Sequence, residues 1–153
     1  GEGRVHRAAR APSGRLTFIH AVIRRPLVCN AEVYSELFWP ELREFQGMVL
    51  LADLVEDHED EARVAALLQQ HGDRTEVEKA FNLVEVPLLF GKRAGEATEE
   101  EVDFLAERLR EMWSARLKAC FPQREFLVEV CPPDEDAEVS LRFFQARAEK
   151  PTA

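Results

Sequence analysis

The chain has 153 residues, of which 46% are hydrophobic, 32% charged and 8% aromatic. A chain of this length and composition forms one domain with a real core, which excludes disorder, a repetitive polymer and a disulfide-dependent miniprotein. No apolar stretch approaches the roughly 20 residues that cross a bilayer. We therefore expect a protein that is not associated with a membrane, and the cysteine usage described below favours the cytoplasm.

The charge is distributed unevenly along the chain. Residues 1–25 contain six arginines and one glutamate, a formal net charge of +5. Because the whole chain has a net charge of −9, residues 26–153 carry a net charge of −14. An acidic body repels nucleic acids and attracts basic proteins. The basic leader, residues 1–14, has no aromatic residues for base stacking, so we do not expect nucleic-acid binding. We expect a flexible basic leader at 1–14, one α+β domain at 15–148 and a frayed tail at 149–153.

The first predicted element is a strand. Residues 16–23 (LTFIHAVI) are apolar or β-branched with little charge, which is typical of a strand buried on both faces. Pro26 ends it, because proline cannot donate to a sheet. Asn30 then indicates the N-cap of a short helix that continues to Leu37.

The next stretch is harder to interpret. Pro40 is compatible with a first helical turn, so residues 41–45 predict the start of another helix. Residues 47–55 (GMVLLADLV) form a short apolar run that fits either a helix or a buried strand. Gly47 punctuates the start of the run and favours the strand.

Two amphipathic helices follow in the middle of the chain. Asp60 is placed to cap a helix over residues 61–71, with Gly72 as its stop signal. Thr75 and Glu78 have the spacing of a capping box, which predicts a further helix start at that position.

The last part of the chain carries the clearest signals. Thr98 and Glu101 form a second capping box, which opens the longest predicted helix, residues 99–119. Residues 126–130 and 139–144 alternate in the manner of two strands, and an acidic turn with two prolines joins them. We predict an α+β fold. Its small antiparallel sheet would contain residues 16–23 and the C-terminal hairpin, with residues 48–55 as an optional further strand. This sheet would pack on several helices, the longest at residues 99–119.

Three cysteines, Cys29, Cys120 and Cys131, leave at least one thiol unpaired and form no C-x-x-C pair. This usage favours a reducing compartment, and each thiol is expected to be a small buried side chain. Motifs for serine hydrolases, dinucleotide binding and P-loops are absent from the sequence. We expect no cofactor, no metal and no catalytic residues, and the chain leans away from being an enzyme.

Acidic residues are densest between positions 53 and 61, and Asp53 and Asp57 are the candidate interaction residues in this segment. Carboxylates beside His58 are suitable ligands for a divalent ion. However, the spacing matches no known metal loop, and acids at this position also suit the start of a helix. We favour the helix cap.

A second group of candidates would form a polar pocket. His20 in the first strand has a side-chain pKa near working pH, and Arg24 and Arg25 follow it. With acids from segment 53–60, these residues describe an alternative function as a small enzyme or a ligand-binding domain. The more common role of a histidine in a strand is a hydrogen-bonded core residue.

Large apolar residues at the edges of predicted elements are the third group. Phe38, Trp39 and Phe90 are core residues if buried, and an interaction site or pocket rim if exposed. Together with the acidic body they predict a non-catalytic binding protein of the adaptor, inhibitor or immunity type. Its partner would be a basic protein, or the chain would self-associate.

Overall fold

The computed structural model describes residues 27–89 and 96–147, and side chains from residue 31 onward within them. The chain divides into two compact units, Gly1–Tyr34 and Ser35–Ala153. The predicted strand at residues 16–23 and the domain boundary near residue 14 lie outside the described residues. Everything below concerns the second unit, apart from the start of helix α2 (Leu27–Phe38).

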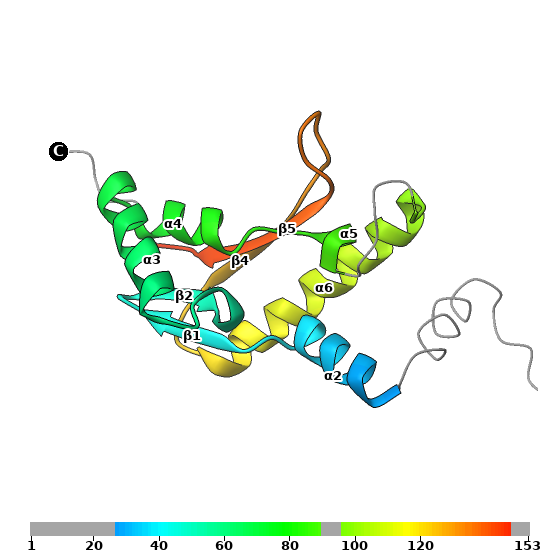
Figure 1. The fold of residues 1–153 in the computed structure, drawn as a ribbon, viewed down its shortest axis with the longest axis horizontal. Coiled ribbons are helices and arrows are strands. Elements are labelled where there is room, and N and C mark those ends of the chain that lie inside the picture. The colour runs from blue at the N-terminus through cyan, green and yellow to red at the C-terminus, as the bar shows by residue number, and fades with distance from the viewer. Residues whose placement is uncertain (1–26, 90–95, 148–153) are drawn as a thin grey trace, which may run out of the picture. The chain divides into compact units, whose positions relative to one another are not determined.

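The described elements form an α+β fold (Figure 1). After α2 come strands β1 (Leu42–Phe45) and β2 (Met48–Leu51), which pair antiparallel. The prediction of a helix at residues 41–45 is therefore wrong. Gln46 and Gly47 have φ values of 50° and 81°, and two positive φ values are what a two-residue hairpin turn requires. The turn and the pairing partner override the weak helical signal of Pro40.

Two helices follow this hairpin and a short 3₁₀ turn, η1 (Ala52–Leu54). Helix α3 (His58–His71) is capped by Asp57, whose carboxylate accepts from two backbone N–H groups, and not by Asp60 as predicted. Helix α4 (Arg74–Phe81) is capped by Asp73, so the predicted Thr75 capping box is not used. In both cases an earlier aspartate captures the free N–H groups and begins the helix sooner.

The segment after α4 combines a strand and a helix. Strand β3 (Val84–Glu85) leads directly into the single turn of α5 (Val86–Leu89). Helix α6 (Glu99–Cys120) then begins at Thr98, whose capping box with Glu101 is present as predicted. Its buried residues recur along one stripe, which confirms the amphipathic pattern read from the sequence: Val102, Ala106, Leu109, Trp113 and Leu117.

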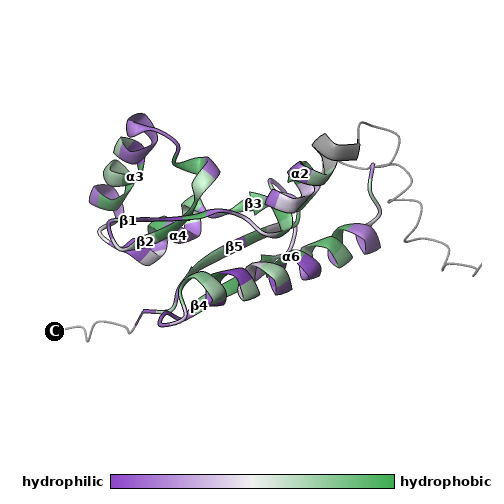
Figure 2. Cartoon of the chain, turned by 90° about the horizontal axis from the view of Figure 1, so that it is seen from below, coloured by the Kyte–Doolittle hydropathy of each residue, from purple (hydrophilic) through white to green (hydrophobic). Residues whose placement is uncertain are grey.

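The C-terminal hairpin is also confirmed. Strands β4 (Phe126–Cys131) and β5 (Ser140–Gln145) pair antiparallel over six consecutive residues, from Phe126 opposite Gln145 to Cys131 opposite Ser140. The sheet order is β3-β5-β4, and all neighbours are antiparallel. Helix α6 lies along this sheet (Figure 2). The strand at 48–51 belongs to the separate two-stranded sheet with β1, and not to the hairpin sheet.

Strand β2 is buried on both faces because it contributes to two apolar clusters. Val49 and Leu51 join the larger cluster with α6 and β5, in which Trp113 meets Phe143 edge to face with ring centroids 5.9 Å apart. Met48 and Leu50 join a second cluster with α3 and α4. Alternate residues of a strand point to opposite faces, so a continuous apolar run is what this position demands.

The two sheets are joined by polar side chains of α4. Asn82, at the C-cap of α4, accepts from the Leu51 N–H at 3.1 Å and donates to the carbonyl oxygens of Val49 at 2.9 Å and Phe143 at 3.3 Å. Glu78, one turn earlier, accepts from the Val49 and Gln145 N–H groups at 3.0 and 2.8 Å. These side chains occupy the backbone groups that a further strand would otherwise pair with.

None of the helices in the described ranges is long and apolar enough to span a bilayer.

Candidate functional site

The strongest candidate is a concavity at the end of the C-terminal hairpin. It has a volume of ≈ 220 Å³ and is lined by β3 and by the loop between β4 and β5. Figure 1 shows this loop, in orange, projecting beyond the neighbouring elements. We call this feature the acidic tip. Its lining contains five carboxylates and no cationic side chain: Glu85, Asp134, Glu135, Asp136 and Glu138, with Pro133 and Ala137.

The loop of the acidic tip is held in one conformation by its own residues. The Asp134 carboxylate accepts from the N–H groups of Asp136 at 2.9 Å and Ala137 at 2.8 Å. The Asp134 N–H in turn donates to the Ala137 carbonyl oxygen at 2.9 Å. An aspartate that binds its own backbone in this way defines a tight turn. The carboxylates of Glu135, Asp136 and Glu138 are therefore presented from a preorganised loop.

Exposed apolar side chains lie close to the acidic tip in the sequence. Leu83 immediately precedes β3 and is 45% exposed, and Leu88 on α5 is 63% exposed. Both lie within three residues of Glu85. The bond from the Val86 N–H to the Val139 carbonyl oxygen, 2.8 Å long, ties this segment to the base of the loop. Apolar anchors beside charged groups are the usual composition of a protein-binding surface.

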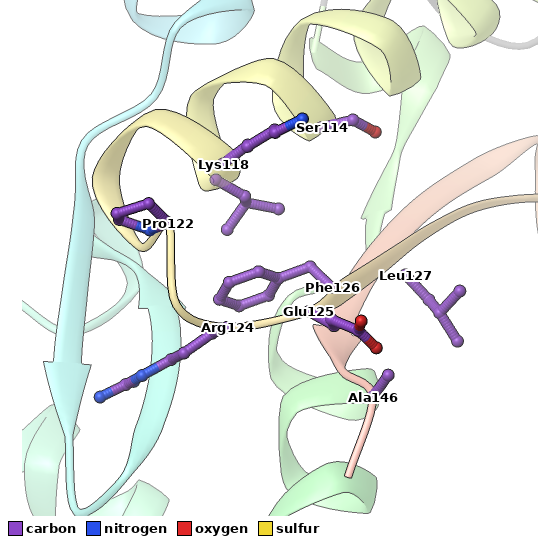
Figure 3. A pocket seen from close by; sticks show the side chains of 9 residues that line it. Ser114, Lys118, Pro122, Arg124, Glu125, Phe126, Leu127 and Ala146 are labelled. Atoms are coloured by element: carbon purple, nitrogen blue, oxygen red, sulfur yellow. The ribbon is translucent and has the colours of Figure 1, made fainter.

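A second cleft, of ≈ 500 Å³, lies between the end of α6 and the start of β4 (Figure 3). Phe126 and Leu117 contribute apolar surface, and the polar lining comes from Ser114 and Lys118 on α6 together with Arg124 and Glu125. The guanidinium of Arg124 binds Glu44 at 2.9 Å, and its Nη1 is buried without a hydrogen-bond partner among the described residues. Figure 3 shows this side chain extending away from Phe126 toward β1. The cleft therefore has a lining of mixed charge, unlike the acidic tip.

A third cleft, of ≈ 580 Å³, borders the start of α4 and the end of β5. It is lined by three cationic side chains, but each has a protein partner. Arg74 donates to the Gln46 carbonyl oxygen, Lys79 pairs with Glu76 at 2.9 Å, and Arg147 binds Glu78. With these charges engaged, the cleft is a structural junction.

Half of the residues predicted as site candidates lie outside the described residues: His20, Arg24, Arg25 and Phe90. Phe38 is half-buried and packs on the larger apolar cluster. Trp39 is 41% exposed, and the Arg116 guanidinium lies 5.4 Å from its ring centroid. Phe38 thus follows the core interpretation, whereas Trp39 keeps an exposed ring.

The acidic segment is organised around helix α3. Asp53 is exposed on η1, and Asp57 uses its carboxylate to cap α3 through Glu59 and Asp60 N–H groups, each at 2.9 Å. Asp60 pairs with Arg63. Within the described ranges, no group of three or more histidine, cysteine or acidic side chains is placed to hold a metal ion. The Asp57 carboxylate therefore acts as a helix cap, as the favoured interpretation of this segment expected. The helix begins at His58, three residues earlier than predicted.

The clearest electrostatic effects occur at pairs on helix surfaces. Hydrogen bonds from His58, at 3.3 Å, and from Arg43 lower the pKa of Glu61 below its usual value. A hydrogen bond from Arg110 likewise lowers the pKa of Glu107, and Glu107 raises the pKa of Arg110. These shifts favour the charged forms of Glu61, Glu107 and Arg110.

Two described cysteines are free. Cys120 at the end of α6 is exposed, contrary to the expectation of a buried thiol. Cys131 at the end of β4 is partly buried.

Sequence reasoning identified the acidic turn but did not select it as a site, and it missed Glu85, which the fold brings to the same concavity. The available signal was the density of acids between Pro133 and Glu138. No known protein family matches the sequence, and neither the curated proteins nor the solved structures yielded a significant match.

Proposed function

We propose that this protein is a non-catalytic binding protein whose acidic tip holds a basic protein partner. The observation that carries the proposal is the concavity lined by five carboxylates without a cation. Elsewhere on the described surface, acids are commonly paired with arginine or lysine, as in Arg108–Glu111 and Arg142–Glu129. At the tip, carboxylates gather without such partners in the lining, so their field is available to a positively charged ligand.

We further propose that the exposed Leu83 and Leu88, within three residues of Glu85 in the sequence, extend this surface with an apolar component. A partner that combined lysine or arginine side chains with an apolar face would meet both the carboxylates and Leu88. Charge complementarity would accelerate the encounter and set the orientation, and apolar burial would retain the complex. The fixed Asp134 turn limits the entropy that the loop loses on binding.

The test uses a designed helical peptide with lysines on one face and leucines on the other, titrated at low salt. Neutralising the tip with Glu135→Gln, Asp136→Asn and Glu138→Gln should weaken binding by about tenfold or more, because three attractive charges are lost. Asp134 is left in place because it holds the turn.

A matched control removes the same number of charges at the acidic segment: Asp53→Asn, Glu56→Gln and Glu59→Gln. If the peptide reads only the net charge of the protein, both triple variants will weaken binding equally, and the proposal fails. Leu88→Ala should weaken binding with little change in its salt dependence, whereas neutralising the tip should flatten that dependence.

The alternative prediction is a ligand pocket built from His20, Arg24 or Arg25 and acids of segment 53–60. Nothing in the described residues supports it, because the histidine and both arginines lie outside them. The carboxylates of Asp57 and Asp60 cap and brace α3.

A further inference from the structure

Strand β4 has a free edge in the described part of the chain. The sheet order β3-β5-β4 gives β4 a strand neighbour on one side only. The Ala146 N–H donates to the Glu125 carbonyl oxygen at 2.9 Å, one step beyond the β4–β5 register. Opposite residues in an antiparallel pair of strands alternate between hydrogen-bonded and non-hydrogen-bonded pairs. The backbone N–H and C=O groups of residues 127, 129 and 131 therefore also face β5. The backbone N–H and C=O groups of Phe126, Val128 and Val130 therefore point outward.

Among the described residues, this edge lacks several features by which proteins usually protect an exposed strand. The β4 sequence contains no proline or lysine, and its register with β5 runs over six residues without a bulge. Its one charged residue, Glu129, is bound to Arg142 at 2.9 Å. The facing edges of β2 and β5 are treated differently, since Glu78 and Asn82 form hydrogen bonds with their backbone groups. An edge left open in this way is suited to receive another strand.

The strand is complementary to itself in one antiparallel register. When two copies pair with Val128 opposite Val128, the outward N–H and C=O groups of both strands are satisfied. Phe126 then lies opposite the second copy's Val130, on the face that α6 covers. On the other face, Leu127 lies opposite the second copy's Glu129. Shifting the register by two residues in either direction would instead oppose Glu129 to a glutamate of the second copy, which is unfavourable.

We propose that two copies of the chain associate through their β4 edges into one continuous antiparallel sheet of order β3-β5-β4-β4-β5-β3. The start of this edge borders the cleft between β4 and α6, where Leu127 is 49% exposed (Figure 3). Because the acidic tip follows the end of β4, the two-fold pairing directs the two tips to opposite ends of the joined sheet. The dimer would thus present two copies of that surface, although its formation does not depend on the proposed partner.

The experiment is sedimentation equilibrium of the full chain over a range of concentrations, where a dimer has twice the mass of the 17.5 kDa chain. The matched variants are Leu127→Glu and Leu127→Lys, which differ in charge at one exposed position. The glutamate would oppose Glu129 of the second copy at two symmetric places and should weaken dimerisation by about tenfold or more. The lysine would pair with that glutamate, so its dimer should be at least as tight as the wild type.

Hydrogen exchange supplies an independent readout. The amides of Phe126, Val128 and Val130 should be protected at high protein concentration and exchange quickly at low concentration. A wild type that is monomeric throughout overturns the proposal, as does protection independent of concentration, which would mean that the same chain covers the edge. Equal responses of the two Leu127 variants also overturn it, since the proposed register demands opposite ones. Thermal unfolding of both variants verifies that they remain folded.

Discussion

The guanidinium of Arg147 holds the carboxylate of Glu78 through two parallel hydrogen bonds, Nη1 to Oε2 at 2.9 Å and Nη2 to Oε1 at 3.0 Å. Glu78 is fully buried, and Arg147, two residues past β5, is 29% exposed at its side chain. The same carboxylate accepts from the Val49 N–H and from the Gln145 N–H and Nε2. One ion pair thus links α4, β2 and the end of β5.

Removing the guanidinium should therefore destabilise the whole fold. Arg147→Ala leaves a buried carboxylate with only neutral donors, and we expect a loss of about 2–3 kcal/mol in the free energy of unfolding, measured by urea denaturation. Arg147→Lys keeps the charge but loses the paired geometry, so its loss should be intermediate. A change below about 0.5 kcal/mol for Arg147→Ala would mean that water replaces the guanidinium without cost.

Asn82 should be equally sensitive, because its amide serves three backbone groups at once. Asn82→Ala leaves the Leu51 N–H and the carbonyl oxygens of Val49 and Phe143 without their partner. We expect a loss of about 2–4 kcal/mol in the free energy of unfolding and faster hydrogen exchange at the Leu51 amide.

Asn82→Asp separates the two functions of that amide. It keeps an oxygen for the Leu51 N–H but places a second oxygen against the two carbonyl groups. It should therefore be at least as destabilising as alanine. A milder effect would show that the donor side of the amide contributes little.

Gly72 ends α3 in the left-handed region, with φ of 67°. A Cβ at this position would meet no atom within 4 Å, so the cost of substitution arises from the backbone alone. Gly72→Ala should reduce the free energy of unfolding by about 1 kcal/mol, and Gly72→Asn by less, because asparagine tolerates this conformation better. Thermal or urea unfolding would measure both, and equal effects of the two substitutions would contradict this account.

Glu61 should contribute a pH-dependent share of stability. Its pKa is lowered in the folded protein by hydrogen bonds from His58 and Arg43, relative to 4.5 for the free group. A lowered pKa means that the unfolded chain binds protons more readily. The contribution is therefore complete above the unfolded value and is lost as the pH falls through the folded value.

Two measurements check this effect. Carboxyl NMR titration should give Glu61 a midpoint below its usual value, and His58→Ala and Arg43→Ala should each move it upward. Glu61→Gln should lower stability relative to the wild type at neutral pH and lose that difference in acid. A difference that persisted unchanged at a pH below the measured Glu61 midpoint would have another origin.

Elements with strong local signals were predictable from the sequence. The Thr98 capping box and the apolar stripe behind it defined α6, and strict alternation defined β4 and β5. Elements with competing local signals were not. Residues 41–45 became a strand because the Gln46–Gly47 turn pairs them with β2, and that choice depends on a partner rather than on propensity.

The candidate site divides in the same way. The acids of the β4–β5 turn can be counted in the sequence, but their concavity exists because the sheet places Glu85 of β3 opposite Ser140, beside that turn. Trp39 and Phe38 are adjacent in the sequence, yet one ring is exposed and the other packs on the core. Periodicity does not distinguish them because α2 ends at Phe38.

By itself, the sequence determined the α+β composition, the long amphipathic helix, the C-terminal hairpin and the acidic character of the chain, since all of these arise from patterns within a few residues. Only the tertiary structure decided that the strands form two sheets and that Glu78, which looks like an ordinary helix-surface residue, is the buried joint between them. It also decided that β4 has a strand neighbour on one side only within residues 27–89 and 96–147. Such features depend on which backbone groups, distant in the sequence, come into contact, and local sequence patterns do not predict those contacts.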